Sequence, residues 1–235
     1  MKTGSVVVFG TGNFASLAWY CLTHDSPWRV EAFTVDRAFV GNGRHEGLPV
    51  IPFEELERDY PPAQIDLLIP LGYQRINALR RERFEQARAR GYRFANYVSS
   101  RASVWPDLAM GENCMVYEHA IIQPFASLGD NVIVRGGAHI CHHSKLGDHS
   151  FVASQAVFGS GVTTGEQVFV GVGSVVRDGV HLGERSFTGA GAVILADTDA
   201  DGVYIGNPAH KAQRTSLEVT SGLRNDDDGA DPVQA

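Results

Sequence analysis

The sequence is poor in cysteine and has no long apolar run, and each absence excludes a class of protein. Only three cysteines, Cys21, Cys114 and Cys141, stand among the 235 residues. They are too few for a disulfide framework or a four-thiolate zinc site, and they fit a reducing cytoplasm. No apolar run approaches the roughly 18 residues that a membrane-spanning helix needs, so we expect none.

Positive charge is also scarce. The formal net charge of -7 argues against a protein that neutralises nucleic-acid phosphates. The apolar stretch Val6–Phe9 is too short for the core of a secretory signal peptide, so none is expected. From Glu218 onward the chain has one Glu, four Asp and one Arg. This end has little to bury, and we expect residues 213–235 to be a disordered acidic tail.

A six-residue period fills the second half of the chain. Counting by sixes from Val98 to Ile194 gives seventeen positions, of which fifteen are apolar. The residue four places after each is usually small or Val. This period matches neither one face of a helix nor a simple alternating strand. It fits a chain that turns a corner every six residues and points one aliphatic side chain inward on each face.

Three such faces make a triangular coil of eighteen residues, and stacked coils form parallel sheets. A glycine followed by an acid recurs every eighteen residues, first at Gly111-Glu112 and last at Gly183-Glu184. Glycine suits a corner that needs positive φ or a close backbone approach, and we expect the acid to be solvated. Antiparallel strands of a sandwich would not keep a fixed register from residue 98 to 194, so we predict a parallel β-helix.

The first half reads as alternating strands and helices. A buried strand at 6–9 is followed by the turn Gly10, Thr11, Gly12, Asn13, then by a helix and a strand at 28–35 that ends at Asp36. Such a G-x-G-x-x-A turn lets backbone N–H groups approach a phosphate, and the acid can accept hydrogen bonds from a nucleoside. Tight packing alone also explains the glycines. We predict a small Rossmann-like domain over residues 1–97.

A basic helix is expected over residues 74–90. It carries six arginines against two glutamates. A solvated surface is the preferred interpretation, and only Arg75, near a strand end, is a candidate ligand contact.

Together the two halves resemble the hexapeptide-repeat acyltransferases, in particular the two-domain bacterial sugar acyltransferases of surface-polysaccharide biosynthesis. The resemblance implies a left-handed β-helix over residues 98–212 and a homotrimer with active sites between neighbouring coils. It also implies acetyl-CoA as co-substrate and a nucleotide-sugar acceptor. The acceptor's nucleotide would be held by Gly10, Thr11, Gly12, Asn13 and Asp36.

The family's closing signature follows the last coil as Gly206-Asn207-Pro208-Ala209. The resemblance places Asn207, Pro208 and a basic residue near CoA. Here His210 intervenes before Lys211, and the same residues could simply turn the chain out of the coil. Glycine-rich positions are expected to admit the pantetheine arm close to the backbone: Gly161, Gly171, Gly173, Gly189 and Gly191.

Histidines gather on one coil as His139-Ile140-Cys141-His142-His143. Acyl transfer to an amine needs a base, and a neutral imidazole suits this because its pKa lies near neutral pH. Since Ile140 points inward, His142 and His143 should lie at a corner and face outward. The family pattern places the catalytic base on His142, supported by His143 or His139.

Two departures from the family pattern stand out. His143 replaces the usual acid, and Phe151 replaces a histidine often found nine residues after the base. A backbone N–H in Gly159-Ser160-Gly161 is the expected oxyanion donor.

We expect N-acetylation of a nucleotide-linked amino sugar without an acyl-enzyme. The alternatives are O-acetylation of a sugar of the sialic acid type and a non-catalytic trimeric scaffold. A zinc site of the carbonic-anhydrase type is a weaker alternative, and no metal is expected. Its nitrogens would come from the histidines at positions 119, 139, 142, 143 and 149.

Overall fold

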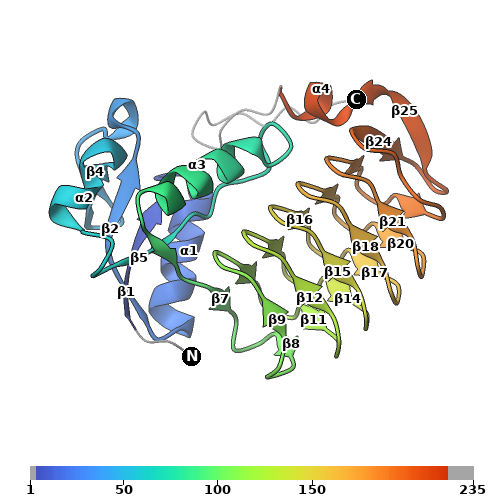
Figure 1. The fold of residues 1–235 in the computed structure, drawn as a ribbon, viewed down its shortest axis with the longest axis horizontal. Coiled ribbons are helices and arrows are strands. Elements are labelled where there is room, and N and C mark those ends of the chain that lie inside the picture. The colour runs from blue at the N-terminus through green and yellow to red at the C-terminus, as the bar shows by residue number, and fades with distance from the viewer. Residues whose placement is uncertain (1–3, 222–235) are drawn as a thin grey trace.

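The computed structural model describes residues 4–221, and within this range a twisted sheet with helices stands against a tall stacked coil (Figure 1). The described residues contain no helix that is long and apolar enough to cross a membrane. The expected tail from 222 onward lies outside the described residues.

The N-terminal sheet has the order β3-β4-β2-β1-β5-β6 and is parallel except for the β3–β4 hairpin. The elements of this domain are β1 (Gly4–Phe9), α1 (Asn13–Asp25), β2 (Trp28–Val35), a 3-10 turn (Arg37–Phe39), β3 (Arg44–His45), β4 (Leu48–Pro52), a second 3-10 turn (Phe53–Glu55), α2 (Leu56–Asp59), β5 (Asp66–Leu68), α3 (Ala78–Ala89) and β6 (Arg93–Phe94). Strand β2 occupies the range predicted from the sequence.

The coil has three parallel sheets, called here faces 1, 2 and 3. Face 1 is made of β7 (Tyr97–Val98), β10 (Met115–Val116), β13 (Ile133–Val134), β16 (Phe151–Val152), β19 (Phe169–Val170), β22 (Phe187–Thr188) and β24 (Gly202–Ile205), with β25 (His210–Thr215) antiparallel at its end. Face 2 is made of β8 (Ser103–Val104), β11 (Ile121–Ile122), β14 (His139–Ile140), β17 (Val157–Phe158), β20 (Val175–Val176) and β23 (Val193–Ile194). Face 3 is made of β9 (Ala109–Met110), β12 (Ser127–Leu128), β15 (Lys145–Leu146), β18 (Thr163–Thr164) and β21 (His181–Leu182).

The register between coils is the predicted eighteen residues. Ile122 pairs with Ile140, and Ile140 pairs with Phe158, each in parallel. Val134, Ile140 and Leu146 lie inside the prism and belong to one continuous core that runs along it. The six-residue period therefore places the aliphatic side chains as predicted.

The repeated glycine–acid pairs hold successive coils together. The Asp130 carboxylate accepts the backbone N–H of Glu112 at 2.8 Å, and Asp148 does the same for Asp130. A Cβ at Gly111 would lie 2.7 Å from the backbone nitrogen of Asp130, so the glycine is required by close approach. The expectation that the acids are merely solvated is wrong for these two, because the coil leaves N–H groups there that need an acceptor.

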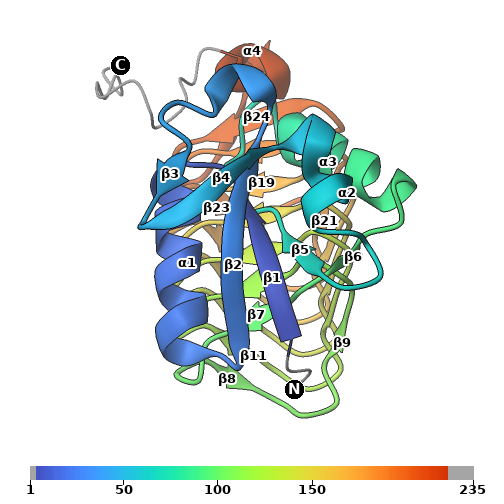
Figure 2. The ribbon, with the colours of Figure 1, turned by 90° about the vertical axis from the view of Figure 1, so that its left-hand side faces the viewer.

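The N-terminal domain packs on face 1. Along β1, Val6 and Val8 point toward α1 and the coil, while Val7 points toward α2 and α3. Figure 2 shows the sheet in front of the coil, with α1 along one side. An aromatic stack covers the contact, with the Tyr73 ring 4.2 Å from that of Phe169.

Helix α3 is fixed to the coil by a buried arginine. Arg80 has no exposed surface and donates to the backbone carbonyl of His149 at 2.8 Å and to the Asn77 side chain at 2.9 Å. It also donates to the carbonyl of Asn131. The expectation that this helix presents only solvated arginines is therefore wrong for Arg80. Burial lowers its pKa to about 9, so the guanidinium remains charged at neutral pH.

The chain is ordered beyond the last coil. Strand β25 ends at Thr215, and α4 (Ser216–Thr220) follows with a capping box between Thr215 and Glu218. The disorder expected from residue 213 onward is therefore wrong for 213–221, because this local sequence satisfies its own helix N-terminus. Ser216 and Thr220 are buried.

Candidate active site

The clustered histidines lie at the corner between faces 2 and 3. Strand β14 ends at Ile140, and the turn to β15 carries His142 and His143, which are both exposed. His139 precedes the inward Ile140 and is half-buried on face 2. His143 has a positive φ of 61°, which turns the chain sharply at this point.

The rings of the two exposed histidines are in direct contact. Nδ1 of His142 lies 2.9 Å from Nδ1 of His143. On its other side, Nε2 of His142 lies 3.0 Å from the Ser160 hydroxyl. Both nitrogens of His142 are therefore engaged, one by an imidazole and one by a group that can donate or accept. His143, which stands where the family pattern has an acid, thus contacts His142 through its own imidazole.

Gln123 connects His139 to the turn. Its side-chain oxygen accepts the backbone N–H of His142 at 3.0 Å, and its amide nitrogen lies 3.1 Å from Nε2 of His139. The amide can only donate at that nitrogen, so His139 carries its own proton on Nδ1. His139 thus supports the turn through Gln123 and does not contact the ring of His142 in this network.

Cys141 is a poor nucleophile at this corner. Its sulfur lies 3.8 Å from Nε2 of His139. Burial, and secondarily the negative charge of Asp178, raise the pKa of the thiol above its ordinary value. The thiolate needed for covalent catalysis is therefore disfavoured, in line with direct attack on the thioester.

The expected oxyanion donors are already used. The N–H of Gly161 donates to the carbonyl of His142 at 2.9 Å, and that of Gly159 donates to Val176 at 2.8 Å. The N–H of Ser160 donates to the Asp178 carboxylate at 2.6 Å. These three groups hold coils together, so the prediction that one of them stabilises an oxyanion is wrong for this arrangement.

An aromatic pocket adjoins the histidines. The Phe125 ring lies 4.8 Å from the ring of His143, and 73% of Phe125 is exposed. Trp105, Asp107 and Gln123 line the same pocket, on the preceding coils. The exposed aromatic ring of Phe125 beside His143 suits a polar ring with an apolar face.

The predicted nucleotide turn lies at the N-terminus of α1. Gly12 is the N-cap residue of this thirteen-residue helix, and no side chain caps it. Gly10 has a φ of 111° and donates its N–H to Thr34 at 2.8 Å. Asn13 begins the helix itself. Asp36 is salt-bridged to Arg83 at 2.6 Å, so its carboxylate is shared with a guanidinium that also lies over the Phe9 ring.

One chain does not bring the two predicted half-sites together. The nucleotide turn belongs to the domain on face 1, whereas His142 stands at the corner between faces 2 and 3, across the prism from face 1. The sequence could not show this, because it gives the order of corners but not which face the first domain covers.

The glycines expected along CoA divide into two groups. Gly161, Gly173 and Gly191 have positive φ and open space where a side chain would be. At Gly171 and Gly189 a Cβ would come within 3.0 Å of the next coil. These two are therefore needed for packing, and only the first three border space that a ligand can enter.

The closing segment places Asn207 and Pro208 in the turn between β24 and β25. Lys211 forms an ion pair with Asp199. Both side chains are more than half exposed, so this ion pair is weak and does not prevent Lys211 from binding another anion. Phe151, in place of the second histidine, contacts Phe14 and the domain-interface stack.

Within residues 4–221, no three metal-ligating side chains lie close enough to hold one ion. His149 of the zinc alternative is buried at the domain interface, where the Asn131 amide donates to its Nδ1 at 2.8 Å.

No family model matches the sequence, and no curated protein matches it. Solved structures do. The acetyltransferase domain of PglB from Neisseria gonorrhoeae is 27% identical with a TM-score of 0.80, over 88% of this chain and 99% of that one. Its complex with acetyl coenzyme A gives 26% and 0.81, over 90% and 100%. PerB from Caulobacter crescentus, in complex with CoA and GDP-perosamine, gives 27% and 0.78, over 90% and 98%.

These matches cover both the N-terminal sheet and the stacked coil. The chain is an acetyltransferase, and it is similar over both parts to sugar acetyltransferases of the hexapeptide-repeat type. The resemblance predicted from the sequence is confirmed, and so is the mixed α/β class with stacked parallel strands.

Three side chains that contact the histidine turn were not predicted from the sequence, which pointed only to the backbone N–H of Ser160. They belong to Gln123, Phe125 and Ser160, and each of these residues stands eighteen residues from a residue of the histidine turn. Ser160 is one coil above His142, and Phe125 is one coil below His143. Because the period stacks residues at this spacing, the signal that would have found them was already in the sequence.

Proposed function

We propose that this acetyltransferase transfers the acetyl group of acetyl-CoA to the amino group of a nucleotide-linked amino sugar, with His142 as general base. The observation that carries the proposal is the exposed imidazole of His142, held on both ring nitrogens in the corner turn. The structural relatives crystallised with acetyl coenzyme A, or with CoA and GDP-perosamine, support the same chemistry.

The proposed reaction needs one base and no acyl-enzyme. The free sugar amine attacks the thioester carbonyl, so a C–N bond forms and the C–S bond breaks. Nε2 of His142 accepts the proton that the nitrogen loses, and the imidazolium returns it to the departing thiolate. Ser160, which occupies Nε2 at 3.0 Å, gives up this position to the amine.

The nucleotide is proposed to bind in a Rossmann-like domain of residues 1–97, while residues 98–212 form the left-handed coil. The uncapped N-terminus of α1, after Gly10, Thr11 and Gly12, supports a diphosphate there. Asn13 and Asp36 are proposed to complete this site, Asp36 with its guanidinium partner. Acetyl-CoA is proposed to lie along Gly161, Gly173 and Gly191, toward Asn207, Pro208 and Lys211.

A homotrimer is proposed because one chain separates its own half-sites. Face 2 carries an outward apolar row in which Ile121, Val157 and Val175 are 38%, 36% and 42% exposed. Such a row on a flat sheet suits contact with another copy. In this assembly the nucleotide turn of one chain meets His142 of a neighbour. We place the enzyme in the cytoplasm, where acetyl-CoA and nucleotide sugars are found, in surface-polysaccharide biosynthesis.

The experiment is a thiol-release assay with acetyl-CoA over a panel of nucleotide amino sugars, nucleotide sugars without an amine, and free sialic acid. Turnover restricted to nucleotide amino sugars supports the proposal. Turnover only with hydroxyl acceptors would indicate O-acetylation, and none with any acceptor would favour a scaffold.

The His142→Ala variant tests the assigned base. We expect kcat to fall by about 100-fold or more, because general-base catalysis contributes roughly that much. His181→Ala is the matched control, since His181 is an exposed histidine on face 3 whose side chain bonds only to the Thr163 hydroxyl among the contacts described. Unchanged turnover in the His142 variant would contradict the assignment.

A further inference from the structure

The contact between the two exposed imidazoles restricts how many protons they can hold. Their Nδ1 atoms are 2.9 Å apart, which is a hydrogen-bond distance. In a neutral pair one ring must donate from Nδ1 and the other must accept there. When both rings are charged, each carries protons on both nitrogens, and two donors face each other.

We propose that His143 is a positioning residue whose bare Nδ1 accepts the Nδ1 proton of His142, so that the reactive form of the corner is a pair of neutral imidazoles. The proposal rests on the proposed function and adds the proton count of the active state. In this arrangement His142 presents a lone pair on Nε2, which is the atom that must take the proton from the amine.

Ser160 completes the arrangement on the other side of the base. Its hydroxyl lies 3.0 Å from Nε2 of His142 and can donate to that lone pair. The serine backbone is fixed by its N–H bond to the Asp178 carboxylate, 2.6 Å away. Ser160 therefore keeps the lone pair aimed at one place until an acceptor amine takes over.

Neighbouring coils hold the pair without a carboxylate. The Phe125 ring lies against His143 at 4.8 Å, and Gln123 accepts the His142 backbone N–H. Among the contacts described for residues 4–221, neither ring is bonded to an acid. An imidazolium on His142 thus lacks the charged partner that a His–carboxylate pair provides, and only the neutral pair offers a base.

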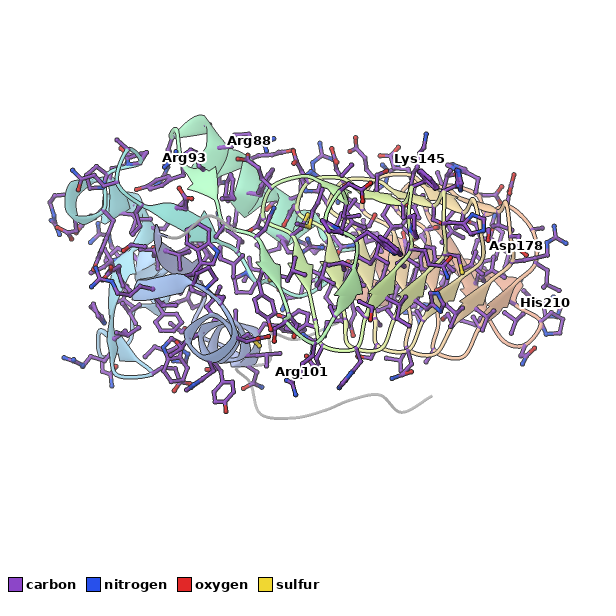
Figure 3. All side chains as sticks on the ribbon, turned by 90° about the horizontal axis from the view of Figure 1, so that it is seen from below. Arg88, Arg93, Arg101, Lys145, Asp178 and His210 are labelled. Carbon is purple, nitrogen blue, oxygen red and sulfur yellow. The ribbon has the colours of Figure 1, made fainter. Side chains whose placement is uncertain are left out.

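Other titratable or charged groups surround the pair on the same and adjacent coils. The carboxylate of Asp178 is used by Ser160 and not by either ring. The groups in this environment are Asp107, His139, Cys141, Lys145 and Asp178. Lys145 and Asp178 both point outward from the coil (Figure 3).

A two-step loss of activity at low pH follows. The first proton taken up by the pair occupies the base, and the second also breaks the contact between the rings. The plot of log kcat against pH should therefore fall with a slope of one and steepen toward two as both imidazoles become charged.

The first experiment measures this slope in the full-length enzyme and in two variants of His143. His143→Asn keeps an acceptor oxygen and tolerates positive φ, so kcat should stay within about tenfold and the acid limb should remain first order. His143→Leu removes the acceptor, and kcat should fall about 100-fold with KM changed less than about twofold. His181→Asn is the control and should keep the wild-type profile.

The second experiment needs no turnover. Nitrogen-15 spectra of histidine-labelled protein at neutral pH should show His142 protonated on Nδ1 only and His143 protonated on Nε2 only, assigned by loss of signals in the two variants. The opposite tautomers would overturn the proposal. So would a wild-type acid limb that stays first order, together with an unchanged kcat in His143→Leu. If no acceptor is acetylated, the proposed function fails while the spectra still decide the imidazole arrangement.

Discussion

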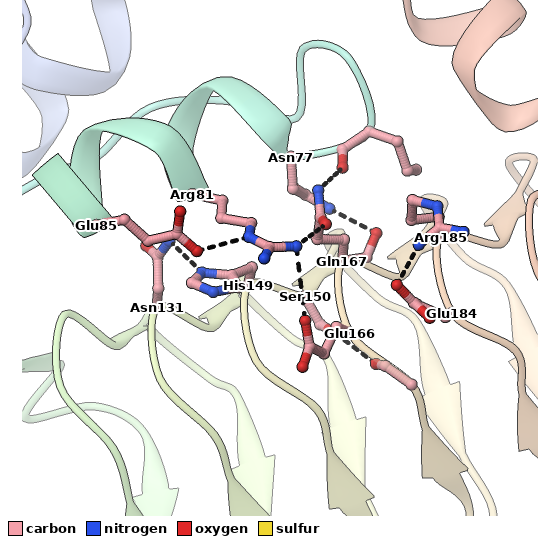
Figure 4. Close-up of polar contacts among 12 residues, drawn as sticks. Asn77, Arg81, Glu85, Asn131, His149, Ser150, Glu166, Gln167, Glu184 and Arg185 are labelled. Carbon is pink, nitrogen blue, oxygen red and sulfur yellow. Dashed lines mark hydrogen bonds and ion pairs between the residues drawn. The ribbon is translucent and has the colours of Figure 1, made fainter.

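Two corners of the same coil each present a histidine in the left-handed conformation, and they are used in opposite ways. His143 and His149 share a φ of 61°. His143 is exposed and touches another imidazole, whereas His149 is 6% exposed beneath α3 and next to Arg80. Figure 4 shows His149 bonded to Asn131 under that helix. The backbone motif is the same, so what lies over the corner decides the role of its side chain.

The covered corner works as a domain joint. Arg80, Asn77 and Gln167 fill it, and the Asn77 amide donates to the Gln167 carbonyl at 3.1 Å. Its donors and acceptors are mostly matched within the protein, which gives rigidity but leaves nothing for a ligand. The open corner keeps its polar atoms near solvent, as a reacting site requires.

The largest expected effect is at the covered corner. Arg80→Met should lower the free energy of unfolding by about 3 kcal/mol, because several buried carbonyl oxygens lose their donor at once. Urea unfolding would measure it. Arg88→Met is the matched control on the same helix. It removes an exposed cation that forms ion pairs with Glu112 and Asp130 on the coil and should cost less than about 1 kcal/mol. Equal losses would remove the distinction between joint and surface.

An intermediate effect should appear in acid. Burial, and then the nearby Arg80 cation, lower the pKa of His149 to about 4 from the ordinary 6.5. Below pH 6.5 the histidine binds a proton in the unfolded chain, whereas in the folded chain it stays neutral until the pH approaches 4. Stability is therefore lost as pH falls from 6.5 toward 4, and about 2 kcal/mol of this loss falls between pH 7 and pH 5.

His149→Asn checks this prediction. Asparagine already stands in the left-handed conformation at residue 131, one coil earlier, so it should fit the same corner. The difference in stability between pH 7 and pH 5 should shrink in this variant. An unchanged difference would mean that His149 does not sense pH.

The smallest expected effect is on stability at the open corner. His142→Ala should change the free energy of unfolding by less than about 0.5 kcal/mol, because the ring is exposed and its contacts are with surface groups. Thermal unfolding beside the activity assay would show it. A loss above about 1 kcal/mol would make this corner structural and would confound its catalytic assignment.

The coil could be predicted almost completely from the sequence, because a strict period fixes which residue points inward at every step. Val134, Ile140 and Leu146 illustrate this. The sequence could not reveal Arg80, because an arginine between other arginines on a helix looks solvated until the neighbouring corner is known. Likewise, nothing in the sequence indicates that the Asp36 carboxylate forms a salt bridge with Arg83. The oxyanion prediction failed because the bonds that stack the coils use the same N–H groups.

The most direct test of the account is subunit complementation. His142→Ala removes the base. Gly12→Asp places a carboxylate at the N-cap of α1, which suits the helix but repels a diphosphate. Each variant alone should be inactive.

If one chain's nucleotide turn works with a neighbour's His142, trimers reassembled from an equal mixture should regain about one quarter of wild-type activity. Each site then needs an intact turn from one chain and an intact base from its neighbour, and each of these is present in half of the chains. A mixture no more active than either variant would show that each chain builds its site alone.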